Sequence, residues 1–246
     1  MVYLISGKSG FIGSSITKYL IDKRHTVYGI SRDCSINELT EYFKEKNPDY
    51  IIHLASYGNH YYQEDFRQMV ETNIIGTYNL LEAAKSINYK VFYNVSSSSV
   101  TLEKQTYYSI TKLCAENLVK MFPKVVNSRP YSVYGPEEAD HKFIPQVIRC
   151  LLTGEKMVLD ENATHDWIYI IDFIVALLAG ETELGTGVKT TNKEIVRMLE
   201  DISGKKLKYV SGKVRSYDND NWVAKKGISS ISIYEGLKKT YEYITR

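Results

Sequence analysis

The fold of this chain is decided by the stretch Val2-Tyr3-Leu4-Ile5-Ser6-Gly7-Lys8-Ser9-Gly10-Phe11-Ile12-Gly13. Its apolar beginning predicts a buried strand over Val2–Ser6, and an amphipathic pattern predicts a helix over Ile12–Asp22. The glycines between them suit a tight turn, close approach of a pyrophosphate to the backbone, and close packing of helix on strand. The N–H groups at the helix start would then face the phosphates. We therefore expect a dinucleotide site that includes Gly7, Ser9, Gly10, Phe11, Ile12 and Gly13.

This turn is not the phosphate loop of a nucleoside-triphosphate site, because no glycine stands at the required distance upstream of Gly7-Lys8-Ser9.

Apolar runs alternate with helical patterns through the first half of the chain, which predicts an α/β fold with a doubly wound parallel sheet, the Rossmann fold. The further strands are expected at Thr26–Ser31, Tyr50–Leu54, Lys90–Val95 and Val125–Arg129, and the further helices at Ile36–Lys46, Asp65–Ile87 and Tyr107–Phe122.

The rhythm of the sequence changes near Ser132, where loops join shorter helical patterns. We expect a dinucleotide-binding domain over residues 1–131 and a small substrate-binding lobe over residues 132–246, packed with it as one unit. The helices expected in this lobe are Phe143–Leu152, Asp172–Ala179, Thr190–Ile202 and Ser232–Ile244, with Asp172 as an N-cap.

The composition of the 246 residues excludes several classes of protein. The net charge of +2 gives no electrostatic case for nucleic acid or a membrane surface as partner. The cysteines Cys34, Cys114 and Cys150 form neither a zinc pattern nor a disulfide framework, so no metal site is expected, and Cys114 is expected to fill an apolar helix face. The beginning of the chain does not resemble a signal peptide, and a cytoplasmic protein is expected.

Tyr108 and Lys112 lie one helical turn apart, which places both side chains on one helix face. A nearby ammonium favours the phenolate, so Lys112 is expected to lower the pKa of Tyr108 and to let it exchange a proton while a hydride moves. The serine run Ser96–Ser99 ends the strand before this helix and supplies hydroxyls for the reacting oxygen. His53 is expected to pack or cap at its strand end, not to react.

The end of the second strand bears on the choice of cofactor. An acidic side chain there binds the ribose hydroxyls of NAD, but this chain has Ser31-Arg32. A hydroxyl followed by a guanidinium suits a 2′-phosphate, so NADP(H) is favoured over NAD(H). The alternative is that Asp33 contacts the ribose and Arg32 is solvated.

Taken together, these motifs resemble those of the extended short-chain dehydrogenase/reductases, in the NAD-dependent epimerase/dehydratase group that modifies nucleotide sugars. The similarity spans nearly the whole chain. It is carried by the stretches His53-Leu54-Ala55-Ser56, Thr72-Asn73-Ile74-Ile75-Gly76-Thr77, Arg129-Pro130-Tyr131-Ser132-Val133-Tyr134-Gly135-Pro136, Phe143-Ile144-Pro145, His165-Asp166-Trp167-Ile168-Tyr169-Ile170-Ile171-Asp172 and Glu235-Gly236-Leu237.

The resemblance implies a role for each matching residue. It implies that Ser97 is the catalytic hydroxyl, that Tyr108 is the acid/base, and that Lys112 binds the nicotinamide ribose. It further implies a homodimer formed through the two long helices. The cofactor would be lined by Leu54, Ala55, Ser56, Asn73 and Tyr131, and the substrate by Ser98, Ser132 and Arg215; a surface charge is the equal alternative for Arg215.

The chain departs from that pattern at four places. The 4,6-dehydratases carry Asp-Glu after the catalytic hydroxyl, where this chain has Ser98-Ser99. Ser97 and Tyr108 are only eleven residues apart, His165 replaces an arginine, and the C-terminal lobe is short. Without the acidic pair, dehydration is disfavoured.

We therefore expect an NADPH-dependent reductase of 4-keto nucleotide sugars. The alternatives are a nucleotide-sugar 4-epimerase with bound NAD, a reductase of a non-sugar carbonyl, and a non-catalytic NADP-binding sensor or scaffold.

Overall fold

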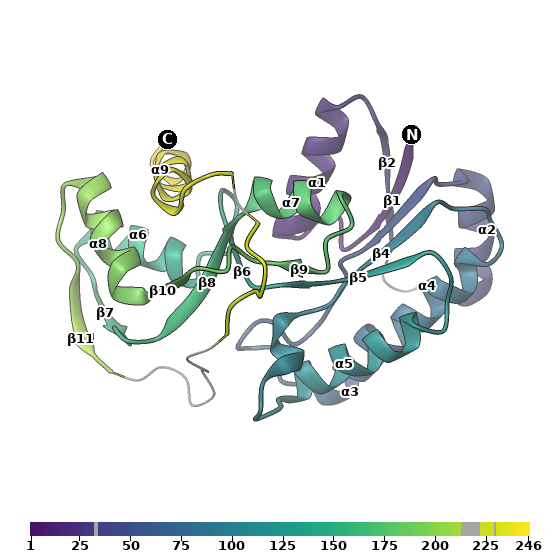
Figure 1. Cartoon of the computed structure of the whole chain (residues 1–246), viewed down its shortest axis with the longest axis horizontal. Helices are drawn as coiled ribbons and strands as arrows, with labels where there is room; N and C mark the ends of the chain where they lie inside the picture. Colours follow the sequence, from purple (N-terminus) through teal and green to yellow (C-terminus); the bar gives the residue numbers. More distant parts are fainter. Residues whose placement is uncertain (32–33, 213–221, 229) are drawn as a thin grey trace. The chain divides into compact units, whose positions relative to one another are not determined.

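The structure is a computed structural model that describes residues 1–31, 34–212, 222–228 and 230–246 (Figure 1). The chain divides into two compact units, which comprise residues 1–129 with 180–182, and residues 130–179 with 183–246. Arg32 and Arg215, which the sequence assigns to cofactor and substrate, lie outside the described residues. The expected boundary after residue 131 and the expected packing as one unit stay predictions.

The first unit is built on parallel strands β1 (Val2–Ser6), β2 (Thr26–Ile30), β3 (Tyr50–His53), β4 (Val91–Val95) and β5 (Val125–Pro130). The sheet has the order β2-β1-β3-β4-β5-β9, where β9 is Glu183–Leu184. The direction of succession reverses between β1 and β3. Ligands bind beside such a reversal, at the carboxyl ends of the strands. The predicted doubly wound α/β fold is confirmed.

Because crossover connections are right-handed, the reversal sends the helices to opposite faces of the sheet. Helix α1 (Phe11–Asp22) covers one face, and α2 (Ile36–Lys46), α4 (Gly76–Ala84) and α5 (Tyr107–Val119) cover the other (Figure 1). Helix α2 begins at a reciprocal cap between Ser35 and Glu38 and ends at Asn47 in the left-handed conformation.

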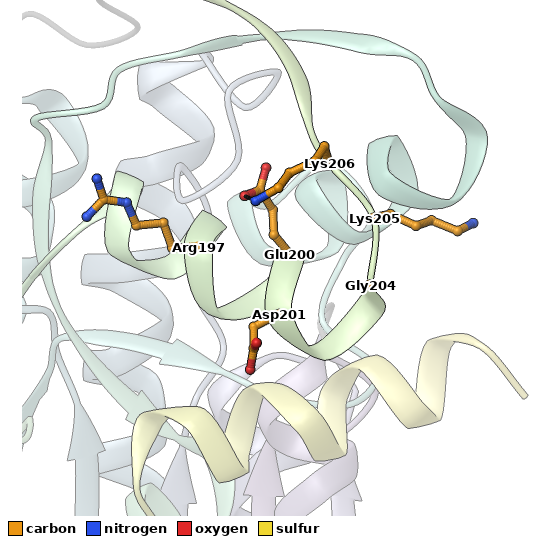
Figure 2. A pocket seen from close by; sticks show the side chains of 6 residues that line it. All are labelled: Arg197, Glu200, Asp201, Gly204, Lys205 and Lys206. Carbon is orange, nitrogen blue, oxygen red and sulfur yellow. Dashed lines mark hydrogen bonds and ion pairs between the residues drawn. The ribbon is translucent and has the colours of Figure 1, made fainter.

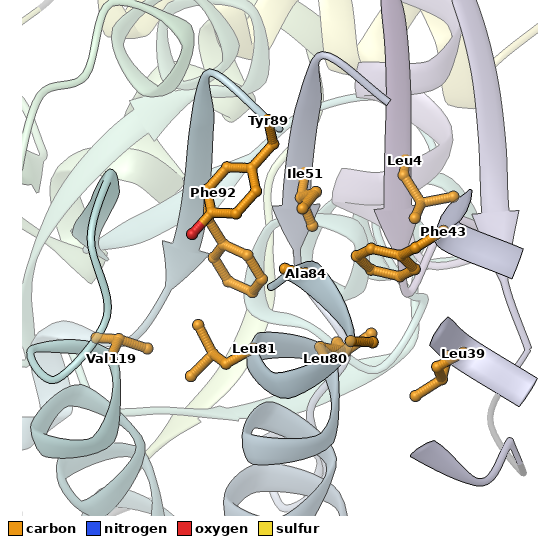
Figure 3. Packing of buried hydrophobic residues seen from close by; sticks show 11 residues of the cluster. Leu4, Leu39, Phe43, Ile51, Leu80, Leu81, Ala84, Tyr89, Phe92 and Val119 are labelled. Atoms are coloured by element: carbon orange, nitrogen blue, oxygen red, sulfur yellow. The ribbon is translucent and has the colours of Figure 1, made fainter. Parts of the chain in front are cut away.

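The apolar core of the first unit fills the space between the sheet and the second group of helices (Figure 3). Strand residues alternate between the faces of the sheet, so Leu4, Ile51 and Phe92 point to this core from three neighbouring strands. The helical side of the core consists of Leu39, Phe43, Leu80, Leu81, Ala83, Ala84 and Val119, with Tyr89 at its rim.

The helix expected over Asp65–Ile87 is interrupted. Asp65 caps α3 (Phe66–Val70) by accepting a hydrogen bond from Gln68 N, at 3.2 Å. A π-helical turn, η1 (Glu71–Ile75), follows before α4 begins. Hydrophobic spacing alone does not reveal such a turn, because its extra residue only shifts the apolar face.

The second unit contains small sheets and helices. One sheet joins β10 (Lys189–Thr191), β8 (Thr164–Tyr169) and β6 (Ser132–Tyr134), and the other joins β11 (Lys208–Ser211) to β7 (Lys156–Leu159). The helices are α6 (Phe143–Thr153), α7 (Ile170–Leu178), α8 (Asn192–Ser203) and α9 (Ile233–Ile244). The sequence did not predict these strands, which are too short to show a clear alternation of apolar and polar residues.

Two expectations for single residues are wrong. Helix α7 begins at Ile170 with Tyr169 as its N-cap, and Asp172 lies inside the helix. Its carboxylate instead accepts hydrogen bonds from Ser230 and Ile231 N. Cys114 is exposed on α5 and fills no core, because the buried face of that helix is formed by other positions.

Among the described residues, no helix is long and apolar enough to span a bilayer, and no group of three or more His, Cys, Asp and Glu side chains is placed to hold a metal ion.

Candidate functional site

The predicted catalytic hydroxyls meet in the first unit, beyond the end of β4. Ser97 caps a short 3₁₀ helix, η2 (Ser98–Thr101), and its Oγ lies 2.8 Å from Ser99 Oγ. Thr106 caps α5, and this cap places Tyr108 in the first turn of the helix. The Tyr108 hydroxyl is hydrogen-bonded to the side chains of Ser56 and Ser97. Two strand ends and one helix start therefore converge on a single phenol.

The pKa of the Tyr108 phenol is raised, chiefly by burial, while the hydrogen bonds from Ser56 and Ser97 oppose the rise. The expectation that Lys112 lowers this pKa is therefore not met in this structure, because desolvation of the phenolate is the larger effect. At neutral pH Tyr108 holds its proton, which is the state needed to donate one.

Lys112 is buried, with 2% of its surface exposed, and its Nζ donates to Val95 O at 2.8 Å. Burial lowers the pKa of Lys112 to about 8, and the charge of Glu116 one turn further along α5 opposes this shift. Glu116 is 1% exposed and receives both Nε and Nη2 of Arg129, at 2.8 and 2.6 Å. Two hydrogen bonds from Arg129 thus hold the Glu116 carboxylate, whose negative charge acts on the buried Lys112 ammonium.

The glycine turn has the shape that a pyrophosphate requires. Gly7 has φ of +72°, and a Cβ there would lie 2.8 Å from Ala55 N. A Cβ on Gly13 would collide with Gly7 O and lie 2.8 Å from Lys8 Cα. Helix α1 begins without a side-chain cap and without an acidic residue in its first turn, so its N–H groups suit an anion. These residues fit a dinucleotide.

The residues expected to line the cofactor are tied together by hydrogen bonds. The backbone N–H groups of Leu54 and Ala55 donate to Ser6 Oγ, each at 3.2 Å. Asn73 exchanges two hydrogen bonds of 2.8 Å with the backbone of Tyr57 and donates to Thr111 Oγ1 at 2.9 Å. Asn73 therefore forms a brace that reaches from the loop after β3 to α5.

The remaining predicted residues that the structure describes are divided between the two units. Ser31 is exposed directly after β2, and Ser98 is buried in η2. Tyr131 and Ser132 belong to the second unit, where Tyr131 N donates to Leu184 O at 3.0 Å and Ser132 begins β6. The functional roles of all these residues stay predictions.

Several residues of the site escaped the sequence analysis. Glu116 follows Lys112 by four positions, a spacing that signals a shared helix face. Gly58 has φ of +104°, and a Cβ there would lie 2.9 Å from Met69 Sδ and 3.1 Å from the ring of Tyr108, so this glycine makes room for both side chains. Ser6 is the register partner of His53 in the parallel pair β1–β3, which becomes visible only when the strand order is known.

The second unit carries a surface pocket of about 380 Å³ at the C-terminal end of α8 (Figure 2). Its acidic side chains already have partners: Glu200 accepts from Lys206 Nζ at 2.7 Å, and Asp201 accepts from Tyr234 Oη at 2.6 Å. None of the predicted site residues that the structure describes lines this pocket, whose lining residues are Arg197, Glu200, Asp201, Gly204, Lys205 and Lys206.

The chain is similar in sequence and in fold to known proteins. Residues 3–189 match the model of the NAD dependent epimerase/dehydratase family. CDP-abequose synthase of Yersinia pseudotuberculosis is 29% identical, over all of this chain and 98% of that protein. dTDP-D-glucose 4,6-dehydratase of Dictyostelium discoideum is 27% identical over 81% of this chain, which spans only 62% of that protein. A structure of UDP-glucuronic acid 4-epimerase from Bacillus cereus, with UDP-glucuronic acid and NAD, is 25% identical with a TM-score of 0.83 and covers 100% of this chain and 99% of that one.

The fold and the family match together define an NAD(P)-dependent enzyme with a Rossmann-like first unit. The chain belongs to the NAD dependent epimerase/dehydratase family, whose enzymes modify nucleotide sugars.

Proposed function

We propose that this chain is an NADPH-dependent reductase of 4-keto nucleotide sugars. The observation that carries the proposal is the arrangement of hydroxyls after β4. Ser97 and Tyr108 are placed for proton transfer, while the next two positions hold Ser98 and Ser99. These hydroxyls cannot replace the acidic pair that removes water in the dehydratases, so the site suits addition of hydrogen to a ketone.

The reaction adds a hydride and a proton to a carbonyl group. The bound cofactor supplies the hydride to the keto carbon. Tyr108 donates its hydroxyl proton to the keto oxygen as negative charge develops there, and Ser97 donates a hydrogen bond to the same oxygen. Burial keeps the pKa of Tyr108 above its ordinary value, which favours the protonated acid before turnover. Solvent then returns a proton to the phenolate.

Lys112 holds the cofactor in this proposal. One N–H of its ammonium is used by Val95 O, and the others are available to the hydroxyls of the nicotinamide ribose. The glycine turn at the start of α1 would hold the pyrophosphate, and Leu54, Ala55 and Ser56 would line the side formed by the loop after β3.

Lys8 supports the preference for NADPH. The stem of this side chain passes over Gly29 in β2, where a Cβ would lie 3.0 Å from Lys8 Cδ. The Lys8 side chain therefore lies against the carboxyl end of β2, the strand end at which the adenosine ribose of a dinucleotide binds. A cation there attracts a 2′-phosphate, as does the guanidinium of Arg32 in the sequence.

The cofactor preference is tested by titrating the protein with NADPH and NADH. We expect NADPH to bind more tightly, and Lys8→Gln to reduce the preference by roughly 3- to 10-fold. Lys18→Gln, on the exposed side of helix α1, is the matched control and should change nothing. Equal preference in the two variants would remove Lys8 from the site.

The reaction is tested by mass spectrometry of the nucleotides released on denaturation, followed by assays with NADPH and 4-keto nucleotide sugars. We expect an empty site or NADP(H), and oxidation of NADPH that depends on the sugar. Tightly held NAD, with interconversion of 4-epimers and no net oxidation, would establish the epimerase instead.

We also propose a homodimer formed through α3, α4 and α5. Phe66 and Tyr107 pack against each other on the outside of this face, with tilted rings whose centroids are 4.6 Å apart. Ile75, Tyr78 and Ile110 continue the same apolar face, and all five side chains are at least 40% exposed. An apolar face of this kind suits a second copy of the chain.

Light scattering tests the dimer. Ile75→Glu is expected to yield monomers, whereas Ile21→Glu, on α1 and 55% exposed, should not. A monomeric wild-type protein would contradict the assignment of this face.

A further inference from the structure

His53 ends β3, directly at the reversal of strand order, and is 2% exposed. Its register partner across the parallel pair is Ser6, which ends β1 immediately before the glycine turn. The imidazole therefore lies between the two loops that the proposed function assigns to the dinucleotide. Each ring nitrogen has one hydroxyl partner, and the positions of the protons can be derived from the bonds that those hydroxyls make.

The partner of Nδ1 is Ser6 Oγ, at 2.6 Å. This oxygen already accepts from Leu54 N and Ala55 N, each at 3.2 Å, so both of its lone pairs are occupied. The N–H of Leu54 is shared with the carbonyl of Ser6, also at 3.2 Å. The hydroxyl can therefore only donate to the ring, and Nδ1 must be the acceptor without a proton.

The partner of Nε2 is Thr77 Oγ1, at 2.9 Å. The Thr77 hydroxyl donates its single proton to Asn73 O at 2.7 Å, one turn earlier in the helix. Nε2 must then carry a hydrogen and donate it to Thr77. The two ends of the ring, deduced separately, specify the same neutral tautomer.

A second proton on the ring has no acceptor. An N–H at Nδ1 would have to displace Leu54 N or Ala55 N from Ser6 Oγ, and this would loosen the loop after β3. The surroundings of the ring also favour its neutral form. Burial lowers the pKa of His53 to about 3, and the positive charge of Lys112 adds to the effect.

We propose that His53, fixed as the neutral tautomer with hydrogen on Nε2, is a positioning residue that holds the two dinucleotide-binding loops in register with each other. On one side it orients the Ser6 hydroxyl that gathers the amides of the loop after β3. On the other side it joins Thr77 and Asn73, whose amide reaches Thr111 Oγ1 on α5. The inference rests on the proposed function only in taking these loops as the cofactor site.

The tautomer is tested directly by long-range ¹H–¹⁵N NMR of the full chain with labelled histidine. The spectrum of His53→Gln assigns the signal of His53 among the five histidines. We expect one bare and one protonated ring nitrogen, with hydrogen on Nε2, unchanged between about pH 5 and about pH 8. Hydrogen on Nδ1, a mixture of tautomers, or titration in this range would overturn the proposal.

The positioning role is tested by Thr77→Val, which keeps the shape of the side chain and removes the acceptor for Nε2–H. We expect the Kd of whichever of NADPH and NADH the wild type prefers to rise roughly 2- to 10-fold, and the NMR signal of His53 to show a mixture of tautomers. Thr40→Val is the matched control, because Thr40 Oγ1 makes the same bond to Ile36 O four residues earlier on α2, at 2.8 Å.

Ser6→Ala gives a second variant in case Thr77→Val folds poorly, and it should weaken the same cofactor by a similar factor. An unchanged Kd in both variants would refute the positioning role. A preference for NADH would instead count against the proposed function alone, since the tautomer and the effect of Thr77→Val are measured on either cofactor.

Discussion

The two units hold their functional segments in different ways. In the first unit, neutral hydroxyls, amides and an imidazole bind segments that lie at neighbouring strand ends. In the second unit, buried carboxylates hold loop segments through several hydrogen bonds each. Asp166 accepts from Thr186 N and Oγ1, Gly187 N and Ala224 N, at 2.6 to 2.9 Å. The first unit is therefore ordered by its topology, whereas the second depends on charges at a few positions.

The largest effect is expected where the first unit performs chemistry. Tyr108→Phe removes the proton donor but keeps the ring that contacts Gly58. We expect kcat to fall by about 10²- to 10⁴-fold, with the affinity for NADPH nearly unchanged. Steady-state kinetics and a binding titration measure the two quantities. Turnover at the wild-type rate would favour the sensor or scaffold.

The second unit should be sensitive to the loss of one charge. Asp166→Asn places an amide NH₂ among backbone donors, and we expect it to reduce the free energy of unfolding by about 3 kcal/mol. Both tryptophans, Trp167 and Trp222, belong to this unit, so their fluorescence in a denaturant titration reports on it.

Asp201→Asn is the control for this measurement, because that exposed carboxylate has its hydrogen bond to Tyr234 at the surface and should cost below about 0.5 kcal/mol. Similar losses in the two variants would remove the contrast between the units.

Variants at two glycines of the turn distinguish a loss of steric packing from a loss of cofactor contact. Gly13→Ala forces a methyl group against Gly7 O, and we expect it to destabilise the chain by about 1–3 kcal/mol and to weaken cofactor binding. Among the described residues, the methyl group of Gly10→Ala meets only Gly7 O, at 3.5 Å, so stability should stay while affinity falls. Circular dichroism melts and NADPH titrations measure both. A stable Gly13→Ala variant would contradict the described turn.

The smallest effect is a shift of a pH profile. Lys112, with a pKa of about 8, is charged below that pH and loses its charge as the pH rises through it. Glu116 stabilises the charge, so Glu116→Gln should lower this pKa and move the alkaline limb of kcat/KM for NADPH to lower pH, by about 1 unit. Glu116→Asp should restore much of it, and Glu82→Gln, on α4, is the surface control. An unmoved limb would show that Glu116 only supports the structure.

The sequence predicted the first unit well because its motifs are local. Strand, turn and helix follow one another from Val2 to Asp22, and the predicted positions of β1 and α1 agree with the structure to within one residue. Tyr108 and Lys112 were identified by their spacing on one helix. In each case the physical signal lies within one continuous stretch of neighbouring residues.

The rest depends on distant partners. Asp172 was taken for a cap because a polar residue before an apolar run suggests one, yet its partners Ser230 and Ile231 are 58 and 59 positions away. The pKa of Tyr108 was predicted in the wrong direction because spacing shows the nearby charge of Lys112 but not the burial of the phenol. No periodicity could reveal that Ser6 and His53 face each other, since this follows from the strand order.

The π-helical turn η1 also limits the insertions and deletions that the helical segment around it can tolerate. Asn73 lies in this turn and faces the loop after β3, while Ile75 and Tyr78 lie on the exposed apolar face. Deleting one residue here would give a more regular α-helix, but it would rotate everything beyond by about 100°. Insertions and deletions in this segment are therefore restricted to those that keep the brace and the outer face in phase.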